Sequence, residues 1–211
     1  MKINAPKIHD ELQEVDLLEL FDLEEPELED ALISQGDAAG ATIERLRLTN
    51  TLLRNVRFTN ADLGRIDLTD VRFENCDFSN ADMSKASMSR VEFIDCKLLG
   101  SNLVESYFGN VKFDRSIVNL AMFGNSKLEK VIFLETSLQN ADLFDCKLKG
   151  VEFLSCDLNG TSFEETSLKG IDISSSTFET MIVALDDLKG CKVSSMQAIQ
   201  FAALIGLVVK E

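Results

Sequence analysis

The chain has 211 residues, is 45% hydrophobic and carries 36 acidic against 21 basic side chains, for a net charge of −15. That composition fits one domain with a packed core, and the negative charge disfavours direct binding of nucleic acid. No signal peptide is recognisable, and the longest apolar run, near residues 201–209, is too short to cross a membrane, so no membrane association is expected.

Residues 1–42 form a distinct acidic segment. It holds two lysines and twelve acidic residues, so its charge is 2 − 12 = −10, whereas the rest of the chain carries 19 basic and 24 acidic residues, or −5. Leu17, Leu18, Leu20, Phe21 and Leu23 offer a short apolar face. We expect an N-terminal cap with a solvated acidic exterior; an acidic partner-binding arm is the alternative.

From residue 43 to residue 193 every fifth residue is Leu, Phe, Ile, Val or Met, without a break in frame. A helix repeats near 3.6 residues and a strand near 2, so a five-residue period indicates an internal repeat. The residue two before each large apolar centre is usually small or β-branched, as in Ala61 and Val71. Each unit is therefore predicted to bury one large and one small side chain.

The residue two after the centre is often Asn or Gly, as at Asn60, Asn80 and Gly100. Both residue types tolerate a positive φ, so this position is predicted to turn the chain. The unit Ala61-Asp62-Leu63-Gly64-Arg65 and its repeats at residues 81 and 141 resemble the pentapeptide-repeat family, whose pattern is A(D/N)LXX. The resemblance covers residues 41–180 and, weakly, 181–193.

That resemblance implies an all-β fold, a right-handed quadrilateral β-helix with four units per coil. The phenylalanine centres alone do not determine the number of units per coil, because five pairs recur at a spacing of 20 residues and five at a spacing of 15. Spacing 20 gives the longest column of rings, predicted as a stacked core ladder: Phe73, Phe93, Phe113, Phe133 and Phe153. Twenty-eight regular units, to residue 180, would make about seven coils and a rod of roughly 34 Å.

The five cysteines, Cys76, Cys96, Cys146, Cys156 and Cys191, all occupy the small inward position. Buried reduced thiols are therefore expected rather than disulfides or a metal site, and they suit the cytoplasm. His9 is the one histidine, and no nucleophile–base pair or phosphate loop is apparent. We expect no enzyme, no cofactor and no metal.

With four units per coil, one side of the rod gathers negative charge toward its C-terminal end. Its members define the acidic face: Glu105, Asp142, Asp145, Glu164 and Glu165. The next side is basic, and its members define the lysine face: Lys127, Lys130, Lys147, Lys149 and Lys169. Either face could be a partner surface or ordinary solvated charge.

Some apolar residues are predicted to point outward, namely Ile94, Leu99, Val104, Ile132, Leu134, Phe144 and Leu154. Single exposed apolar side chains are normal in proteins. Ile132, Leu134 and Leu154 could nevertheless form a contact patch on one side.

After Val193 the period changes. Ser194 and Ser195 can cap a helix predicted over residues 196–205, and Gly206 fits its end. This helix, within residues 194–211, is apolar almost all round and must be covered on two sides. The last coil can cover one side and a second copy the other, which predicts a homodimer through Ile199, Phe201, Ala202, Leu204, Ile205 and Leu207.

The run Gln197–Ala203 followed by Gly206–Val209 resembles the ending of the Qnr and MfpA quinolone-resistance proteins, and residues 166–172 and 2–7 are similar to their Gram-positive members. That resemblance implies a dimeric rod that mimics duplex DNA and binds DNA gyrase or topoisomerase IV. Many Qnr proteins carry loops that this unbroken frame lacks. Duplex DNA of 34 Å carries roughly twenty charges, so only the acidic face could imitate a phosphate track here. A protein-interaction rod with an unknown partner is the alternative.

Overall fold

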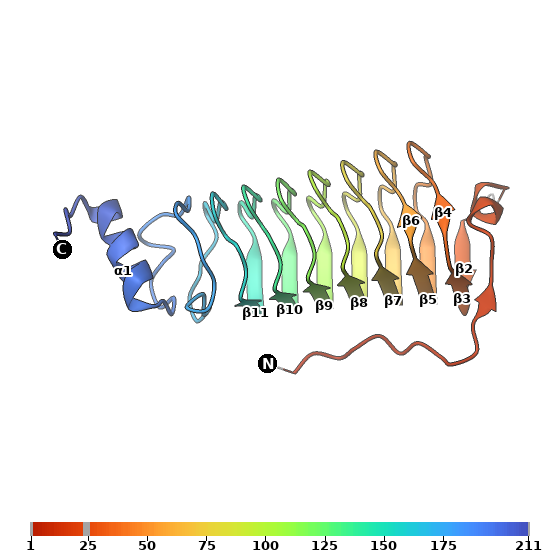
Figure 1. The fold of residues 1–211 in the computed structure, drawn as a ribbon, viewed down its shortest axis with the longest axis horizontal. Coiled ribbons are helices and arrows are strands. Elements are labelled where there is room, and N and C mark those ends of the chain that lie inside the picture. Colours follow the sequence, from red (N-terminus) through yellow and green to blue (C-terminus); the bar gives the residue numbers. More distant parts are fainter. Residues whose placement is uncertain (1, 23–25, 211) are drawn as a thin grey trace.

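The computed structural model describes residues 2–22 and 26–210; the side chains of Phe21, Asp22 and Ile205 are also outside the description. The chain forms a rod of stacked coils with a helix at its C-terminal end (Figure 1). The main parallel sheet runs in the order β1 (Gln13–Glu14), β3 (Ala31–Ile33), β5 (Arg47–Arg54), β7 (Asp67–Glu74), β8 (Ser87–Ile94), β9 (Tyr107–Asp114), β10 (Lys127–Leu134) and β11 (Lys147–Leu154). The remaining strands are β2 (Glu27–Glu29), β4 (Gly36–Asp37) and β6 (Val56–Arg57).

The coil contains four five-residue units. Along the main sheet, from β5 through β7 to β11, each strand pairs with the next in that sheet so that residues four units apart lie side by side, as Phe93 does with Phe113. The other two sides of the coil are joined by isolated bridges in the same register, such as Asp62 with Asp82. The four-unit coil is confirmed, and a coil of three units, which the spacing of 15 residues would have indicated, is excluded.

A left-handed residue turns each corner. Every fifth residue from Gly40 to Gly170 has a positive φ, with values from 46° at Asp145 to 82° at Gly170. These are the positions that lie two after each centre, so the turn prediction is confirmed. Side chains other than Asn and Gly adopt this conformation at a cost of about 1 kcal/mol or more each, and the stacked coils stabilise it against that cost.

The core holds both inward side chains of each unit. Phe73, Phe93, Phe113, Phe133 and Phe153 stack with centroids 4.9–5.1 Å apart, which confirms the predicted ladder. In the small position, hydroxyls and thiols donate to a carbonyl oxygen of the preceding coil, as from Ser116 to Phe93 at 3.2 Å and from Thr136 to Phe113 at 3.1 Å. Polar groups therefore enter the core because the backbone of that coil accepts their hydrogen bonds.

The solenoid register begins before residue 43. β2 and β3 pair with β5, and β4 pairs with β6, all in the register of the later coils. The 3-10 helix η1 (Leu17–Asp22) closes this first coil with Leu17 and Leu20, each 1% exposed, while Leu18 is 61% exposed. Leu23 lies outside the described residues. The acidic segment thus supplies a coil as well as a cap.

Residues 2–9 form an extended strap along the rod, seen beneath the row of strands in Figure 1. Backbone N–H groups of the strap donate to side chains of one corner column: His9 to Asn50 at 2.9 Å, Lys7 to Asp70 at 2.9 Å and Asn4 to Asn110 at 3.1 Å. The column accepts these bonds because Asn or Asp oxygens project from three of its coils, with Arg90 between Asp70 and Asn110. The strap was not predicted from the sequence.

We expect acid to loosen this strap. The Arg90 guanidinium, and after it the Lys7 amide, hold the pKa of Asp70 below its usual 3.8. A carboxylate with a depressed pKa contributes stability that is complete above the usual value and is lost as the pH falls through the lower folded value. The amide resonances of Lys7 and His9 should therefore move toward unstructured positions as the pH is lowered below about 4.

Asp70→Ala should release the strap at neutral pH and lower the free energy of unfolding by about 1.5–3 kcal/mol, because it removes hydrogen bonds to a charged group. Asn110→Ala, the control, removes one neutral bond and should cost about 0.5–1.5 kcal/mol. Unchanged strap resonances in Asp70→Ala would show that the strap is held by other contacts.

At the C-terminal end, α1 (Ser195–Ala202) begins at the N-cap Ser194 with a reciprocal capping pair to Gln197, continues as the 3-10 turn η2 (Ala203–Ile205) and ends at Gly206 with φ 74°. Gln197 donates to the carbonyl oxygens of Ile173 and Ser176 at 2.9 and 2.8 Å, which satisfies carbonyls that no further coil could reach. The predicted helix and its cap are confirmed.

Candidate functional site: an acidic face on the C-terminal half of the rod

One corner column of the rod changes sign along its length. Its left-handed residues are Arg45, Arg65, Lys85, Glu105, Asn125, Asp145 and Glu165, all of them exposed. Because a corner residue with positive φ points its side chain away from the core, these charges stand at the surface. The N-terminal half of this edge is basic, and the half nearer α1 is acidic.

Elsewhere on the rod, acidic and basic side chains are paired between coils. Arg54 contacts Glu74 at 2.7 Å, Arg72 contacts Glu92 at 2.8 Å and Arg115 contacts Asp95 at 2.9 Å, each at the equivalent position of an adjacent coil. Arg57 pairs with Asp37 in the same way. Each exposed pair adds little stability, but it leaves little net charge in this part of the surface.

The acidic face differs from that pattern at four of its five members. Glu105 contacts Lys85 at 3.7 Å, so its charge is partly offset. Asp142, Asp145, Glu164 and Glu165 form no ion pair with any residue in the described parts of the chain, and the last three are exposed. Asp142 accepts a hydrogen bond from the Phe144 amide at 3.0 Å. The structure thus groups four carboxylates without a cation among them.

Asp145 and Glu165 occupy the same column in successive coils, as do Asp142 and Ser162, which form an isolated bridge. Successive coils lie about 4.8 Å apart, so the carboxylates form a short track parallel to the rod axis. Such a track attracts a basic surface and repels nucleic acid.

The lysine face is less free than the acidic face. Glu129 forms ion pairs with the Nζ atoms of Lys127 at 3.2 Å and Lys149 at 3.7 Å. The Lys127 Nζ also lies 5.7 Å from the centre of the Tyr107 ring. These contacts keep part of the lysine charge in local interactions. Lys130, Lys147 and Lys169 are exposed on the same side.

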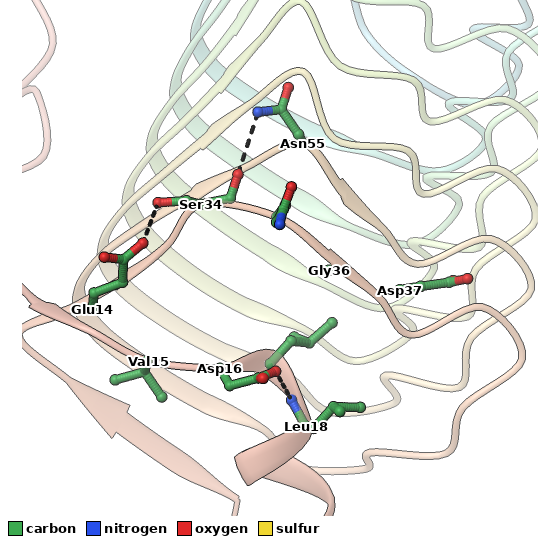
Figure 2. Close-up of a pocket in the computed structure, with 10 residues that line it drawn as sticks. Glu14, Val15, Asp16, Leu18, Ser34, Gly36, Asp37 and Asn55 are labelled. Carbon is green, nitrogen blue, oxygen red and sulfur yellow. Dashed lines mark hydrogen bonds between the residues drawn. The ribbon is translucent and has the colours of Figure 1, made fainter.

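A hollow at the N-terminal end of the rod has a volume of about 740 Å³ (Figure 2). Several of its polar groups have partners: Ser34 donates to Glu14 at 3.0 Å, and Asp16 accepts from the Leu18 amide at 3.0 Å. Asp37 pairs with Arg57. Apart from the exposed Ser34–Glu14 pair, the described residues that line the hollow place no nucleophile beside a base, so no function is assigned to it.

The described residues contain no cluster of three or more His, Cys, Asp and Glu side chains that could hold a metal ion. Burial raises the pKa of the Cys146 and Cys156 thiols to about 11, so both are protonated at neutral pH. Cys191 is half-buried and the other cysteines are buried. No helix in the described part of the chain is long and apolar enough to span a membrane.

The outer side of the C-terminal segment is apolar and uncovered. Ile199, Leu204 and Leu207 are 47%, 45% and 57% exposed. Met196, Val208 and Val209, which the predicted interface omitted, are exposed as well. Phe201 points the other way, with its ring 5.1 Å from that of Phe178, and Ala202 is half-buried. The side chain of Ile205 lies outside the description.

Three exposed apolar residues in the middle of the rod were also missed. Ile117, Leu120 and Met122 are 39%, 55% and 41% exposed, beside the predicted Leu99 at 38%. A signal was present at Leu120, which fills a position where the repeat favours Asn or Gly. Of the patch suggested by the sequence, Leu134 and Leu154 do lie beside each other in the register of β10 and β11.

Two family descriptions of pentapeptide repeats match the repeated part of the chain. The family described as "Pentapeptide repeat region" matches residues 66–143, and "Pentapeptide repeats (8 copies)" matches residues 37–75 and 136–174. No curated protein matches the chain.

Among solved structures, a trypsin-treated variant of QnrB1, a plasmid-mediated fluoroquinolone resistance protein, is 19% identical with a TM-score of 0.46, over 88% of this chain and 92% of that one. HetL, a pentapeptide repeat protein involved in heterocyst differentiation regulation in the cyanobacterium Nostoc, is 15% identical with a TM-score of 0.34, over 79% and 86%. A pentapeptide repeat protein of the Arabidopsis thaliana thylakoid lumen is 24% identical with a TM-score of 0.37, over 50% and 67%.

Proposed function

Because the chain belongs to the pentapeptide-repeat family, we propose that it acts as a non-enzymatic interaction rod whose acidic face binds a type II topoisomerase, DNA gyrase or topoisomerase IV, in place of duplex DNA. The observation that carries this proposal is a group of four carboxylates that form no ion pair with another described residue, on a rod where such pairs are frequent: Asp142, Asp145, Glu164 and Glu165. The cytoplasm is the compartment we assign to it.

Duplex DNA presents a regular line of negative charges, and a protein that binds DNA offers a basic groove to receive them. A stiff rod with a line of carboxylates can occupy the same groove. The resemblance of residues 197–209 to the ending of the Qnr and MfpA proteins supports a topoisomerase as the partner that carries this basic groove. Protection of the enzyme from quinolones is part of the proposal.

A homodimer would extend the track. The exposed apolar side chains of Ile199 on α1, Leu204 on η2 and Leu207 after Gly206 belong to the segment whose Phe201 packs on the last coil. Pairing two such ends in a two-fold arrangement would bury them. The acidic halves of both rods would then adjoin the junction, and the basic halves would lie at the outer ends.

Leu204→Asp is expected to shift the protein toward the monomer, because a charge buried in an apolar interface must be desolvated without a partner. Light scattering at a series of protein concentrations measures the mass. Leu18→Asp, an exposed leucine at the opposite end, is the control and should leave the mass unchanged. A monomeric wild-type protein at all concentrations would contradict the dimer.

Supercoiling by purified gyrase, with this protein titrated in and with or without a quinolone, tests the topoisomerase assignment. We expect inhibition at low micromolar protein, or rescue of the enzyme from the drug. No effect in either assay, and none on topoisomerase IV, would remove the assignment and leave an interaction rod with another partner.

A separate observation favours an interaction rod with another partner: the apolar residues Leu134 and Leu154 are adjacent on β10 and β11. A partner other than a topoisomerase, recovered by pull-down and lost on Leu134→Glu and Leu154→Glu, would favour it.

A further inference from the structure

Four apolar side chains form a corner patch in the middle of the rod: Leu99, Ile117, Leu120 and Met122. Their exposed fractions are 38%, 39%, 55% and 41%. Leu120 turns a single corner, with Ile117 before it and Met122 after it, and Leu99 belongs to the preceding coil, beside the backbone of Asn119. The patch is therefore continuous across two sides of the rod and two coils.

Leu120 is unusual for its position. It has φ 59°, and between residues 40 and 170 it is the one aliphatic side chain among the left-handed corner residues. The same column holds Asn80, Gly100, Asn140 and Gly160, types that adopt this conformation readily. A leucine there is both strained and exposed, so neither the backbone nor the core accounts for it.

No described segment covers the patch. The strap follows the column of Asn50, Asp70 and Asn110, which is two sides of the coil away from Leu120, and α1 lies beyond the last coil. Four side chains are also too few to hold a second copy alone, since a stable interface buries about 800 Å² on each partner. They are enough for the apolar centre of a larger, charged surface.

The patch adjoins the acidic face. Met122 forms isolated bridges with Asn102 on one side and with Asp142 on the other, so Asp142 lies in the next coil directly beside it. Asp145, Glu164 and Glu165 follow toward the C-terminal end on the same side. A partner that meets these carboxylates with a basic surface would reach the patch within about one coil, or 4.8 Å.

We propose that this corner patch is the apolar anchor of the partner-binding surface: it receives an apolar side chain that projects from the basic, DNA-binding surface of the partner. The assignment rests on the proposed function, since it takes the same topoisomerase as the partner. The carboxylates attract and orient that surface, and the contact at Leu120 slows its release.

Leu120→Asn separates binding from folding, because it installs the residue that the column has at 80 and 140. We expect the unfolding midpoint to stay the same or rise as the strain at φ 59° is relieved, while the affinity for immobilised gyrase falls by about tenfold, mainly through faster dissociation. Met122→Ser should weaken binding in the same way. Leu18→Asn, at 61% exposed on the opposite end, is the matched control and should keep the wild-type affinity.

Each outcome decides the assignment. Affinity within twofold of wild type for both Leu120→Asn and Met122→Ser, while reversal of the acidic face abolishes binding, would overturn the anchor and leave the proposed function standing. A wild-type protein that binds no topoisomerase would overturn both. A change of oligomeric mass on Leu120→Asn, seen by light scattering, would show that a second copy covers the patch and would overturn the assignment to the partner.

Discussion

Phe113→Ala is expected to lower the free energy of unfolding by about 3–5 kcal/mol, the range for a buried phenylalanine that leaves a cavity. The Phe113 ring is fully buried and stacks between Phe93 at 5.0 Å and Phe133 at 4.9 Å. It also meets Phe123 edge-on at 6.3 Å. Truncation therefore removes contacts to two coils and to the opposite side of the coil at once.

The surrounding coils cannot close the cavity, because their hydrogen-bonded spacing is fixed by the backbone. Urea unfolding measures the loss, with Lys147→Ala as a control on the exposed part of β11, where a change within about 0.5 kcal/mol is expected. Phe113→Leu should lose less than Phe113→Ala because it retains most of the volume. A cost below about 1 kcal/mol for Phe113→Ala, far under the usual range, would contradict the role of the ring as the middle of the ladder.

Reversal of Asp142, Asp145, Glu164 and Glu165 to lysine is expected to abolish topoisomerase binding, a loss of at least about 100-fold. Opposed like charges at an interface cost several kcal/mol, and a cost of about 1.4 kcal/mol already lowers an affinity tenfold. The rod should remain folded and keep the oligomeric mass of the wild type, since Asp145, Glu164 and Glu165 are exposed and none of the four forms an ion pair with another described residue. Circular dichroism and light scattering check both properties.

A matched control reverses carboxylates outside the acidic face. Glu135→Lys and Glu179→Lys change exposed residues on other sides of the rod and should weaken binding only slightly. The affinity of the wild type should also fall steeply with salt, because the attraction is screened over about 8–10 Å. Wild-type affinity in the fourfold variant would show that the acidic face is not the contact.

Local pattern accounts for much of the fold. The five-residue frame of residues 43–193 assigned each side chain to the inside or the outside, and it located the left-handed corners from Asn60 to Gly170. Ser194, Ser195 and Gly206 marked the C-terminal helix and its ends. These features depend on residues within a few positions of one another, so they can be predicted from the sequence alone.

What the pattern could not supply depends on which coil lies beside which. Phenylalanine spacing alone was equally consistent with a coil of three units and a coil of four. Only the observed four-unit register shows that Arg72 meets Glu92 while Asp145 and Glu165 meet no cation among the described residues. The direction of Phe201 toward Phe178, away from the predicted dimer surface, likewise depends on the docking of α1 on the last coil.

The strap shows the same division most plainly. Asn4 and Asn110 lie far apart in the chain, and no periodicity links them. The sequence by itself determined the coil's unit, its corners and its buried residues, because each unit folds by rules that are local to a single repeat. The tertiary structure alone decided which charges are neutralised, where the strap lies and which apolar side chains gather around Leu120, because those contacts exist only once the coils are stacked.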